Sequence, residues 1–205
     1  MSTSDAHVRR ALAHLRRVDP VMAGVIRRVG PYRPRMRLGR SHFHDLVRSV
    51  VYQQLSGKAA GTIHARCCAL FPRKHVDPER LLALSDDALR SAGLSRQKIG
   101  YLRDLAHKVH TGAVPLDRVR FMNDDAIIAH LVQVKGIGRW TAQMFLMFRL
   151  GRPDVLPEMD LGIQNAIQRT YGLRRRATPD DVRRIGAPWS PYSTIASWYL
   201  WRSLD

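Results

Sequence analysis

Helical spacing of apolar residues is the feature that most limits the folds open to this 205-residue chain. Apolar residues recur every three or four positions in almost every segment, while the strict alternation of a half-buried strand is scarce. The segment 96–110 illustrates the pattern, since Ile99, Leu102, Leu105 and Val109 would all lie on one side of a helix. Most such segments are preceded by Ser, Thr, Asp or Asn, which are the usual N-cap residues. The sequence therefore predicts an all-α fold.

Breaks at Gly and Pro divide this pattern into separate helices. We expect helices over residues 5–17, 20–29, 42–55, 58–70, 78–84, 85–92, 96–110, 124–132, 139–150 and 160–171, with two more beginning near 178 and 190. The last two share a start signal, Thr178-Pro179 and Ser190-Pro191, in which a capping residue precedes Pro at the first helical position. The length suits one globular domain or two small lobes that share a cleft.

The charge of the chain favours a polyanionic partner. It carries 34 Lys and Arg against 17 Asp and Glu, for a formal net charge of +17. Only five of these basic residues are Lys, and the Arg guanidinium can bind phosphate through two parallel hydrogen bonds. Nucleic acid is the partner that such an excess most often serves, and the alternative is a solvated basic surface.

Other residue counts bear on compartment and cofactors. The adjacent Cys67 and Cys68 are unsuited to a mutual disulfide and read as small buried side chains of a reducing compartment. The nine His are scattered without a metal-binding spacing. No apolar run approaches transmembrane length, and the N-terminus does not resemble a signal peptide. We expect a soluble cytoplasmic monomer with no membrane partner, associated with the nucleoid if bacterial.

Gly136 and Gly138 flank Ile137 in a turn between two predicted helices. Glycines there allow a tight turn and close approach of a phosphate to the backbone, and the start of the following helix would attract that phosphate. Lys135 and Arg139 add positive charge on either side. The turn predicts DNA-backbone contact without sequence preference, although many helix turns use Gly without binding anything.

Two further stretches have alternative interpretations. Gln53, Gln54 and Leu55 end one helix with polar side chains at an exposed corner, which suits either ordinary turn polarity or a wedge that fills the gap left by an extruded base. The Pro- and Gly-broken basic loop 30–40 contains Tyr32, and it could contact DNA, line a pocket or serve as a solvated linker.

Asp160 stands at the predicted start of a helix, where an N-cap role and a catalytic role fit equally well. The nearby Asp154 is a rival carboxylate, but its position after a turn favours a structural cap.

Together these segments resemble the helix-hairpin-helix/Gly-Pro-Asp superfamily of DNA glycosylases, and are most similar to its 3-methyladenine DNA glycosylase II branch. VKGIGRWTAQMF is similar to the hairpin and DVLPEMDLGIQ to the segment that ends in the catalytic Asp. FHDLVRSVVYQQLSGKAA, LRSAGLSRQKIGYLRDLA and WSPYSTIASWYLWR are similar to the wedge helices, the helices that follow and the C-terminal helix. The likeness covers roughly Phe43 to Arg202.

The resemblance implies one glycosylase domain over 1–205, made of two helical lobes, roughly 39–150 and 1–38 with 151–205, with a cleft between them. It implies that Asp160 is catalytic, that the wedge is Gln54 or its neighbours Gln53 and Leu55, and that the hairpin binds the DNA backbone. The implied backbone contacts are Lys135, Gly136, Gly138, Arg139 and Thr141, and the implied base-pocket residues are Trp140, Trp201, Met144 and Tyr32. The carbonyls of Val132, Val134 and Ile137 match those that hold a monovalent cation, Na⁺ or K⁺, beside a phosphate.

Departures from the family pattern sharpen these expectations. The hairpin begins Lys135-Gly136 where relatives commonly have Pro-Gly, which adds a phosphate contact. We expect the protein to lack the N-terminal β-rich domain that some relatives carry, and the four cysteines of iron–sulfur relatives are missing. Lyase relatives place a Schiff-base Lys where this chain has Trp140.

We therefore expect a monofunctional enzyme of base excision repair that flips an alkylated purine such as 3-methyladenine out of double-stranded DNA and hydrolyses its glycosidic bond, with no cofactor required for the chemistry. Trp140 and Trp201 would stack on a cationic base, with a core position as the alternative for Trp201. The alternative function is a non-catalytic helix-hairpin-helix DNA-binding protein, and a bifunctional glycosylase/lyase is a third.

Overall fold

The computed structural model describes residues 5–34 and 41–205, and every regular element in these two ranges is a helix. The all-α prediction is therefore confirmed. No helix in these ranges combines the length and the apolar character that a membrane span requires.

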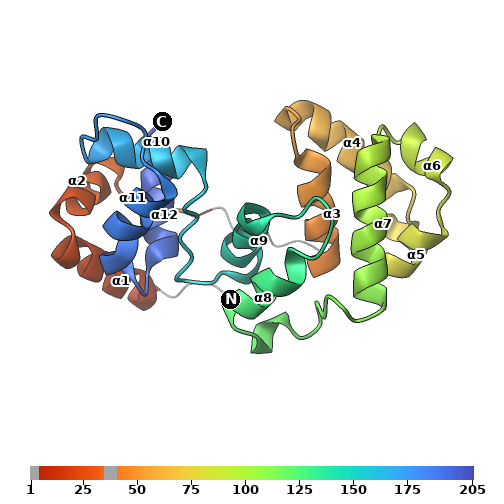
Figure 1. Cartoon of the computed structure of the whole chain (residues 1–205), viewed down its shortest axis with the longest axis horizontal. Helices are drawn as coiled ribbons and strands as arrows, with labels where there is room; N and C mark the ends of the chain where they lie inside the picture. Colours follow the sequence, from red (N-terminus) through yellow and green to blue (C-terminus); the bar gives the residue numbers. More distant parts are fainter. Residues whose placement is uncertain (1–4, 35–40) are drawn as a thin grey trace. The chain divides into compact units, whose positions relative to one another are not determined.

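The chain divides into two compact units (Figure 1). Unit 1 consists of Met1–Met36 and Leu146–Asp205, and unit 2 consists of Arg37–Phe145. The expected second lobe boundary, between 150 and 151, lies about one helical turn later than the observed one. The turn Leu146–Leu150 belongs to unit 1, where Leu146 accepts a hydrogen bond from Arg152 N at 3.0 Å.

Unit 1 packs its helices around a core that includes the fully buried Trp189 and Tyr199. Its α-helices are α1 (Asp5–Val18), α2 (Pro20–Val29), α10 (Leu161–Thr170), α11 (Pro179–Gly186) and α12 (Ser193–Arg202).

Asp19 is a buried carboxylate that joins three parts of this unit. Its Oδ1 accepts from Met22 N at 2.9 Å and so caps α2. Its Oδ2 accepts from the Tyr171 hydroxyl at 2.6 Å and from Trp189 Nε1 at 2.8 Å. Burial, followed by this contact with Asp19, raises the pKa of Tyr171. The three hydrogen bonds to this one carboxylate offset the free-energy cost of burying the Asp19 side chain.

The two Pro-containing helix starts have different outcomes. The start predicted at Thr178 is confirmed, because Thr178 caps α11. Its hydroxyl and backbone N–H also form a reciprocal capping box with Asp181. The prediction for Ser190-Pro191 is wrong, because α12 begins at Ser193 and has no local side-chain cap. Asp154, distant in sequence, accepts from Ser193 N at 3.1 Å and from the Ser190 hydroxyl at 2.6 Å. The structural role expected of Asp154 is thus confirmed, and the helix that it caps is α12.

Unit 2 is arranged around α7 (Arg96–His110), which packs against α3, α5 and α6 (Figure 1). The other α-helices of the unit are α3 (His42–Tyr52), α4 (Gly57–Ala69), α5 (Pro78–Ala83), α6 (Asp86–Ser91), α8 (Asp124–Leu131) and α9 (Arg139–Phe145).

The predicted extension of α3 to residue 55 is wrong, because Gln53 leaves the helix at ψ 133° and Gln54 adopts a positive φ of 56°. The predicted 139–150 helix is also regular only to Phe145, beyond which it widens into a π-helical turn.

Candidate active site and nucleic-acid interface

The turn between α8 and α9 depends on Gly136. This residue has φ +80°, and a Cβ added to it would lie 2.2 Å from Cδ2 of the Tyr101 ring on α7. Both the backbone conformation and the close ring contact therefore require glycine. Gly138 differs, because a Cβ added there would have no atom within 4 Å. The space beside Gly138 is open, as close approach of a phosphate to this backbone requires.

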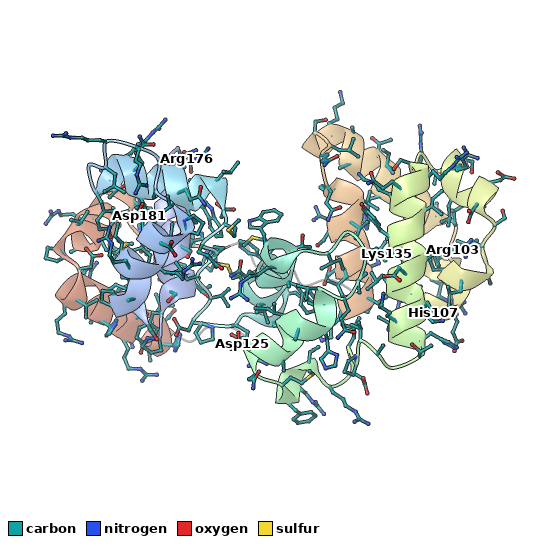
Figure 2. The ribbon with its side chains drawn as sticks, viewed as in Figure 1. Arg103, His107, Asp125, Lys135, Arg176 and Asp181 are labelled. Atoms are coloured by element: carbon teal, nitrogen blue, oxygen red, sulfur yellow. The ribbon has the colours of Figure 1, made fainter. Side chains whose placement is uncertain are left out.

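The same turn is fastened to α7 by Asp104. Its Oδ2 accepts from Lys135 N at 2.8 Å, and the Lys108 ammonium forms an ion pair with it at 2.6 Å. Burial alone would raise the pKa of Asp104, but the hydrogen bonds from Lys108 and Lys135 N outweigh it and hold the pKa below its usual value. The Lys135 residue is exposed at the hairpin (Figure 2), as is Arg139. Two cations therefore border the open backbone.

The turn after α3 separates the two candidate wedge glutamines. Gln54 is exposed, whereas the half-buried Gln53 donates from Nε2 to the Gly136 carbonyl at 2.8 Å. Lys98 on α7 donates from Nζ to the carbonyls of Val51, at 2.6 Å, and Gln53, at 2.8 Å. Burial lowers the pKa of Lys98. These bonds attach the turn to both α7 and the hairpin, and they place Gln54 at its exposed tip. Leu55, 39% exposed, follows it.

One face of α7 thus contacts both the turn after α3 and the hairpin turn between α8 and α9. Lys98, Tyr101 and Asp104 recur at three-residue spacing, which places them along one side of the helix. Sequence reasoning missed their roles. Their spacing was readable, but the backbone groups that they contact are 31 to 47 residues away in sequence.

Asp160 is both the N-cap of α10 and the partner of a tryptophan. Its Oδ1 accepts from Ile163 N at 2.8 Å and from Trp201 Nε1, on α12, at 2.9 Å. Gly162 permits this arrangement, since a Cβ there would lie 3.0 Å from both Asp160 Oδ1 and Trp201 Cδ1. The capping interpretation is confirmed, but the indole contact goes beyond what a cap needs. It fixes the orientation of the half-buried carboxylate.

The Trp201 indole also contacts a second aromatic ring and the core of unit 1. Its ring stacks on Phe148 with centroids 5.8 Å apart and an interplanar angle of 28°, and it packs against the unit 1 core. The core interpretation of Trp201 therefore holds in part, and the same side chain also orients Asp160.

Comparison with known proteins identifies the group to which these features belong. Residues 47–191 match the family described as HhH-GPD superfamily base excision DNA repair protein. The chain belongs to this family. The matched range includes the hairpin, Gln54 and Asp160, while Trp201 lies beyond it.

Individual members are similar over nearly the whole chain. DNA-3-methyladenine glycosylase 1 of Schizosaccharomyces pombe is 32% identical over 95% of this chain and 86% of its own length. The solved structure of the Schizosaccharomyces pombe 3-methyladenine DNA glycosylase in complex with abasic DNA matches with a TM-score of 0.84, at 32% identity, over 95% of this chain and 96% of that one. The crystal structure of DNA-3-methyladenine glycosidase from Bacillus halodurans matches with a TM-score of 0.86, at 35% identity, over 99% and 91%.

The residues expected in the base pocket of an HhH-GPD protein are distributed over both units. Trp140, 44% exposed, and the half-buried Met144 lie one turn apart on α9 in unit 2. In unit 1, Tyr32 packs edge-on against Trp198 with centroids 4.9 Å apart and stacks on Tyr199 at 6.2 Å. Burial, followed by the nearby Tyr199, raises the pKa of Tyr32 to about 12. Residues 35–40 of the basic loop around Tyr32 lie outside the described residues.

Two other expectations concern the backbone of the HhH-GPD hairpin. Thr141 is 7% exposed, so a phosphate could contact little of its side chain. Among the three carbonyls expected to hold a cation, that of Val134 accepts from Ile137 N at 3.0 Å. A carbonyl oxygen has a second lone pair, and neutral oxygens within one turn suit a hard cation of low charge. The donor set at Val132, Val134 and Ile137 therefore fits Na⁺ or K⁺.

Proposed function

We propose that the protein is a monofunctional DNA glycosylase that removes alkylated purines from double-stranded DNA. The observation that carries the proposal is the contact between Asp160 and Trp201, which orients a carboxylate in the family segment where the catalytic Asp is expected. Similarity to a 3-methyladenine DNA glycosylase bound to abasic DNA supports both the partner and the product.

The chemistry follows from the charge that develops when the base leaves. Breaking the bond between C1′ and the base nitrogen leaves positive charge on the sugar, and the Asp160 carboxylate stabilises it. Water then adds its oxygen to C1′ and releases one proton, because a purine that is cationic when alkylated at a ring nitrogen departs as a neutral base. The products are a free purine and an abasic site, with the DNA strand intact.

Trp140 supports the hydrolytic, monofunctional outcome. The resemblance places the Schiff-base Lys of lyase relatives at this position, and an indole has no amine to attack C1′. The absence of a borohydride-trapped complex on damaged DNA is the expected result, and a trapped complex would establish the lyase alternative.

An exposed indole also favours a cationic base. A purine alkylated at a ring nitrogen carries positive charge, and its stacking on Trp140 gains roughly 0.5 to 2 kcal/mol of cation–π attraction. We expect release of 3-methyladenine and 7-methylguanine in preference to neutral lesions such as hypoxanthine. A panel of duplexes with defined lesions would measure this order.

Gln54 is the better wedge candidate of the two glutamines. Extruding a base leaves a gap in the stack that a side chain must fill. Gln54 is exposed at the tip of a turn that Lys98 and Gln53 hold in place. Gln54→Ala is expected to slow base release more than Leu55→Ala does.

We also propose that the carbonyls of Val132, Val134 and Ile137 hold a monovalent cation beside a bound phosphate. DNA affinity should then be higher in K⁺ or Na⁺ than in tetramethylammonium at the same ionic strength, because the larger organic ion cannot approach three carbonyls. Equal affinity in all three salts would exclude this site.

Asp160→Asn tests the central assignment. The amide oxygen can still accept from Ile163 N and Trp201 Nε1, so folding and DNA affinity should be retained while base release is lost. Asp180→Asn, which removes a carboxylate from the first turn of α11 in the same unit, is the matched control and should release base normally. Full activity of Asp160→Asn would refute the catalytic role. Equal affinity for damaged and undamaged DNA, without base release by the unmodified protein, would establish the non-catalytic alternative.

A further inference from the structure

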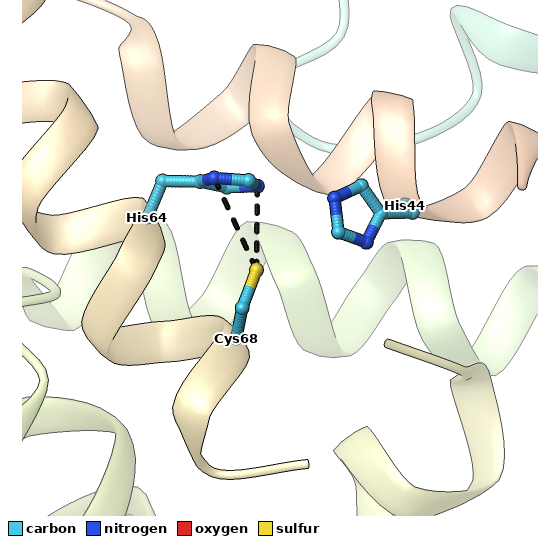
Figure 3. Close-up of side chains that lie close together, drawn as sticks. All are labelled: His44, His64 and Cys68. Carbon is cyan, nitrogen blue, oxygen red and sulfur yellow. Dashed lines mark hydrogen bonds between the residues drawn. The ribbon is translucent and has the colours of Figure 1, made fainter. Parts of the chain in front are cut away.

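Three side chains with metal-binding atoms meet where α3 packs against α4 (Figure 3). His44 belongs to α3, and His64 and Cys68 belong to α4. One ligand atom from each lies within 4.8 Å of the other two. The expectation that the histidines are scattered without a metal-binding spacing is therefore wrong for His44 and His64. His64 and Cys68 are four residues apart, so they share a helix face, and only the approach of His44 from another helix could not be read from the sequence.

The separation of the Cys68 and His64 ligand atoms suits a tetrahedral ion. Zinc–sulfur and zinc–nitrogen bonds of about 2.3 and 2.05 Å at a tetrahedral angle separate the two ligand atoms by about 3.6 Å. The Cys68 Sγ lies 3.6 Å from His64 Nε2 and 3.9 Å from its Nδ1. The rings of His44 and His64 are nearly perpendicular, with centroids 5.1 Å apart.

The three donor side chains lie in a largely enclosed part of unit 2, since His44 and His64 are half-buried and Cys68 is buried. Cys68 is 6% exposed and neither cysteine of the chain forms a disulfide. Arg48, whose guanidinium lies 3.8 Å above the Tyr52 ring, opposes a dication electrostatically and should make binding weaker than at a four-ligand structural zinc site.

We propose that His44, His64 and Cys68 form a site for a divalent ion of the zinc class, with water as the fourth ligand. A mixed nitrogen and sulfur donor set selects such an ion over Mg²⁺ or Ca²⁺. Binding converts the Cys68 thiol to a metal-bound thiolate and releases one proton to solvent. The ion would cross-link α3 to α4 and so brace the pair of helices joined by the turn 53–56. This site does not depend on the glycosylase assignment.

Cobalt titration of the metal-stripped full chain tests the site, because Co²⁺ in a tetrahedral thiolate site has thiolate-to-metal charge-transfer and d–d absorption bands. One equivalent should produce these bands, and Zn²⁺ should abolish them by displacement. The adjacent cysteine supplies the matched control. Cys67→Ala should titrate like the unmodified protein, whereas Cys68→Ala should lose the charge-transfer band. His64→Gln and His44→Gln should each weaken binding at least about tenfold.

Thermal unfolding gives a second measurement that is independent of base release. Zn²⁺ should raise the melting temperature of the unmodified protein and of Cys67→Ala, but not that of Cys68→Ala or His64→Gln. If Cys68→Ala does not fold, His64→Gln decides the question, because its half-buried side chain is replaced by one of similar length. The absence of a thiolate band, a band that persists in Cys68→Ala, or an undiminished cobalt affinity in His64→Gln would overturn the proposal.

Discussion

Gly136 and Gly138 differ by two positions in one turn, and the structure predicts opposite consequences when each is replaced by Ala. In Gly136→Ala the φ of +80° costs about 1–2 kcal/mol for a residue with a Cβ. The 2.2 Å contact with the Tyr101 ring forces that ring to move, which adds about 1–3 kcal/mol of overpacking. The total of roughly 2–5 kcal/mol lowers the melting temperature by about 4–20 °C in a protein of this size.

Gly138→Ala should leave folding nearly unchanged. No atom lies within 4 Å of the added Cβ and the residue has no positive φ, so the expected loss of stability is below about 1 kcal/mol. The methyl group would instead occupy the space through which a phosphate approaches. We expect DNA affinity to fall about tenfold, equivalent to about 1.4 kcal/mol.

Circular dichroism melting and fluorescence anisotropy with an undamaged duplex separate the two effects. Tyr101→Ala in the Gly136→Ala background should recover the overpacking part and leave the dihedral part. The reasoning is refuted if Gly136→Ala melts like the unmodified protein, or if Gly138→Ala binds DNA with undiminished affinity.

Three further predictions concern contacts of single side chains. Lys98→Met removes two hydrogen bonds to the turn after α3 and should slow base release about tenfold. If Lys98 acts by positioning Gln54, this effect should vanish in a Gln54→Ala background, whereas simple addition of the two effects in single-turnover assays would argue against the role. Trp201→Phe keeps an aromatic ring but loses the bond to the Asp160 carboxylate, so base release should fall about tenfold while DNA affinity stays constant, and a normal rate would contradict the orienting role. The pKa of Asp104 is depressed in the folded state, so the stability that Asp104 contributes is complete above its unfolded pKa of about 3.9 and is lost as the pH falls through the lower folded pKa. The free energy of urea unfolding should therefore depend less on pH in this acidic range for Asp104→Asn than for the unmodified protein, and an equal pH dependence would show that Asp104 is not responsible.

Much of the fold could be read from local patterns. The spacing of apolar residues and the caps at Ser41, Ser56, Ser95 and Asn123 predict helices that the structure contains, because these signals act within one or two turns. The helix start predicted at Ser190-Pro191 is wrong because a contact distant in sequence decides where α12 begins. There a local cap signal is superseded by Asp154, whose contact with Ser193 spans 39 residues and leaves no trace in the local pattern.

The candidate site shows the same division. The motif order predicts roles for Asp160 and the glycine turn, since both predictions depend on residue type and spacing along the chain. It could not reveal that Trp201 orients Asp160, because 41 residues separate them, or that Lys98 supports the turn after α3. The distinction between Gln53 and Gln54 likewise required the observed bond from Gln53 to the hairpin.

The attachment of residues 154–160 to α12 makes the position of Asp160 sensitive to the length of a distant helix. Asp154 binds Ser193 at the start of α12 and Asp160 binds Trp201 near its end, about 12 Å further along the axis. Deleting one residue between Ser193 and Trp201 would change the rotational phase of the indole by about 100° and withdraw it from the carboxylate, while the contacts of Asp154 remained. Loop 154–160 and helix α12 must therefore keep matched lengths, and a change in one requires a compensating change in the other.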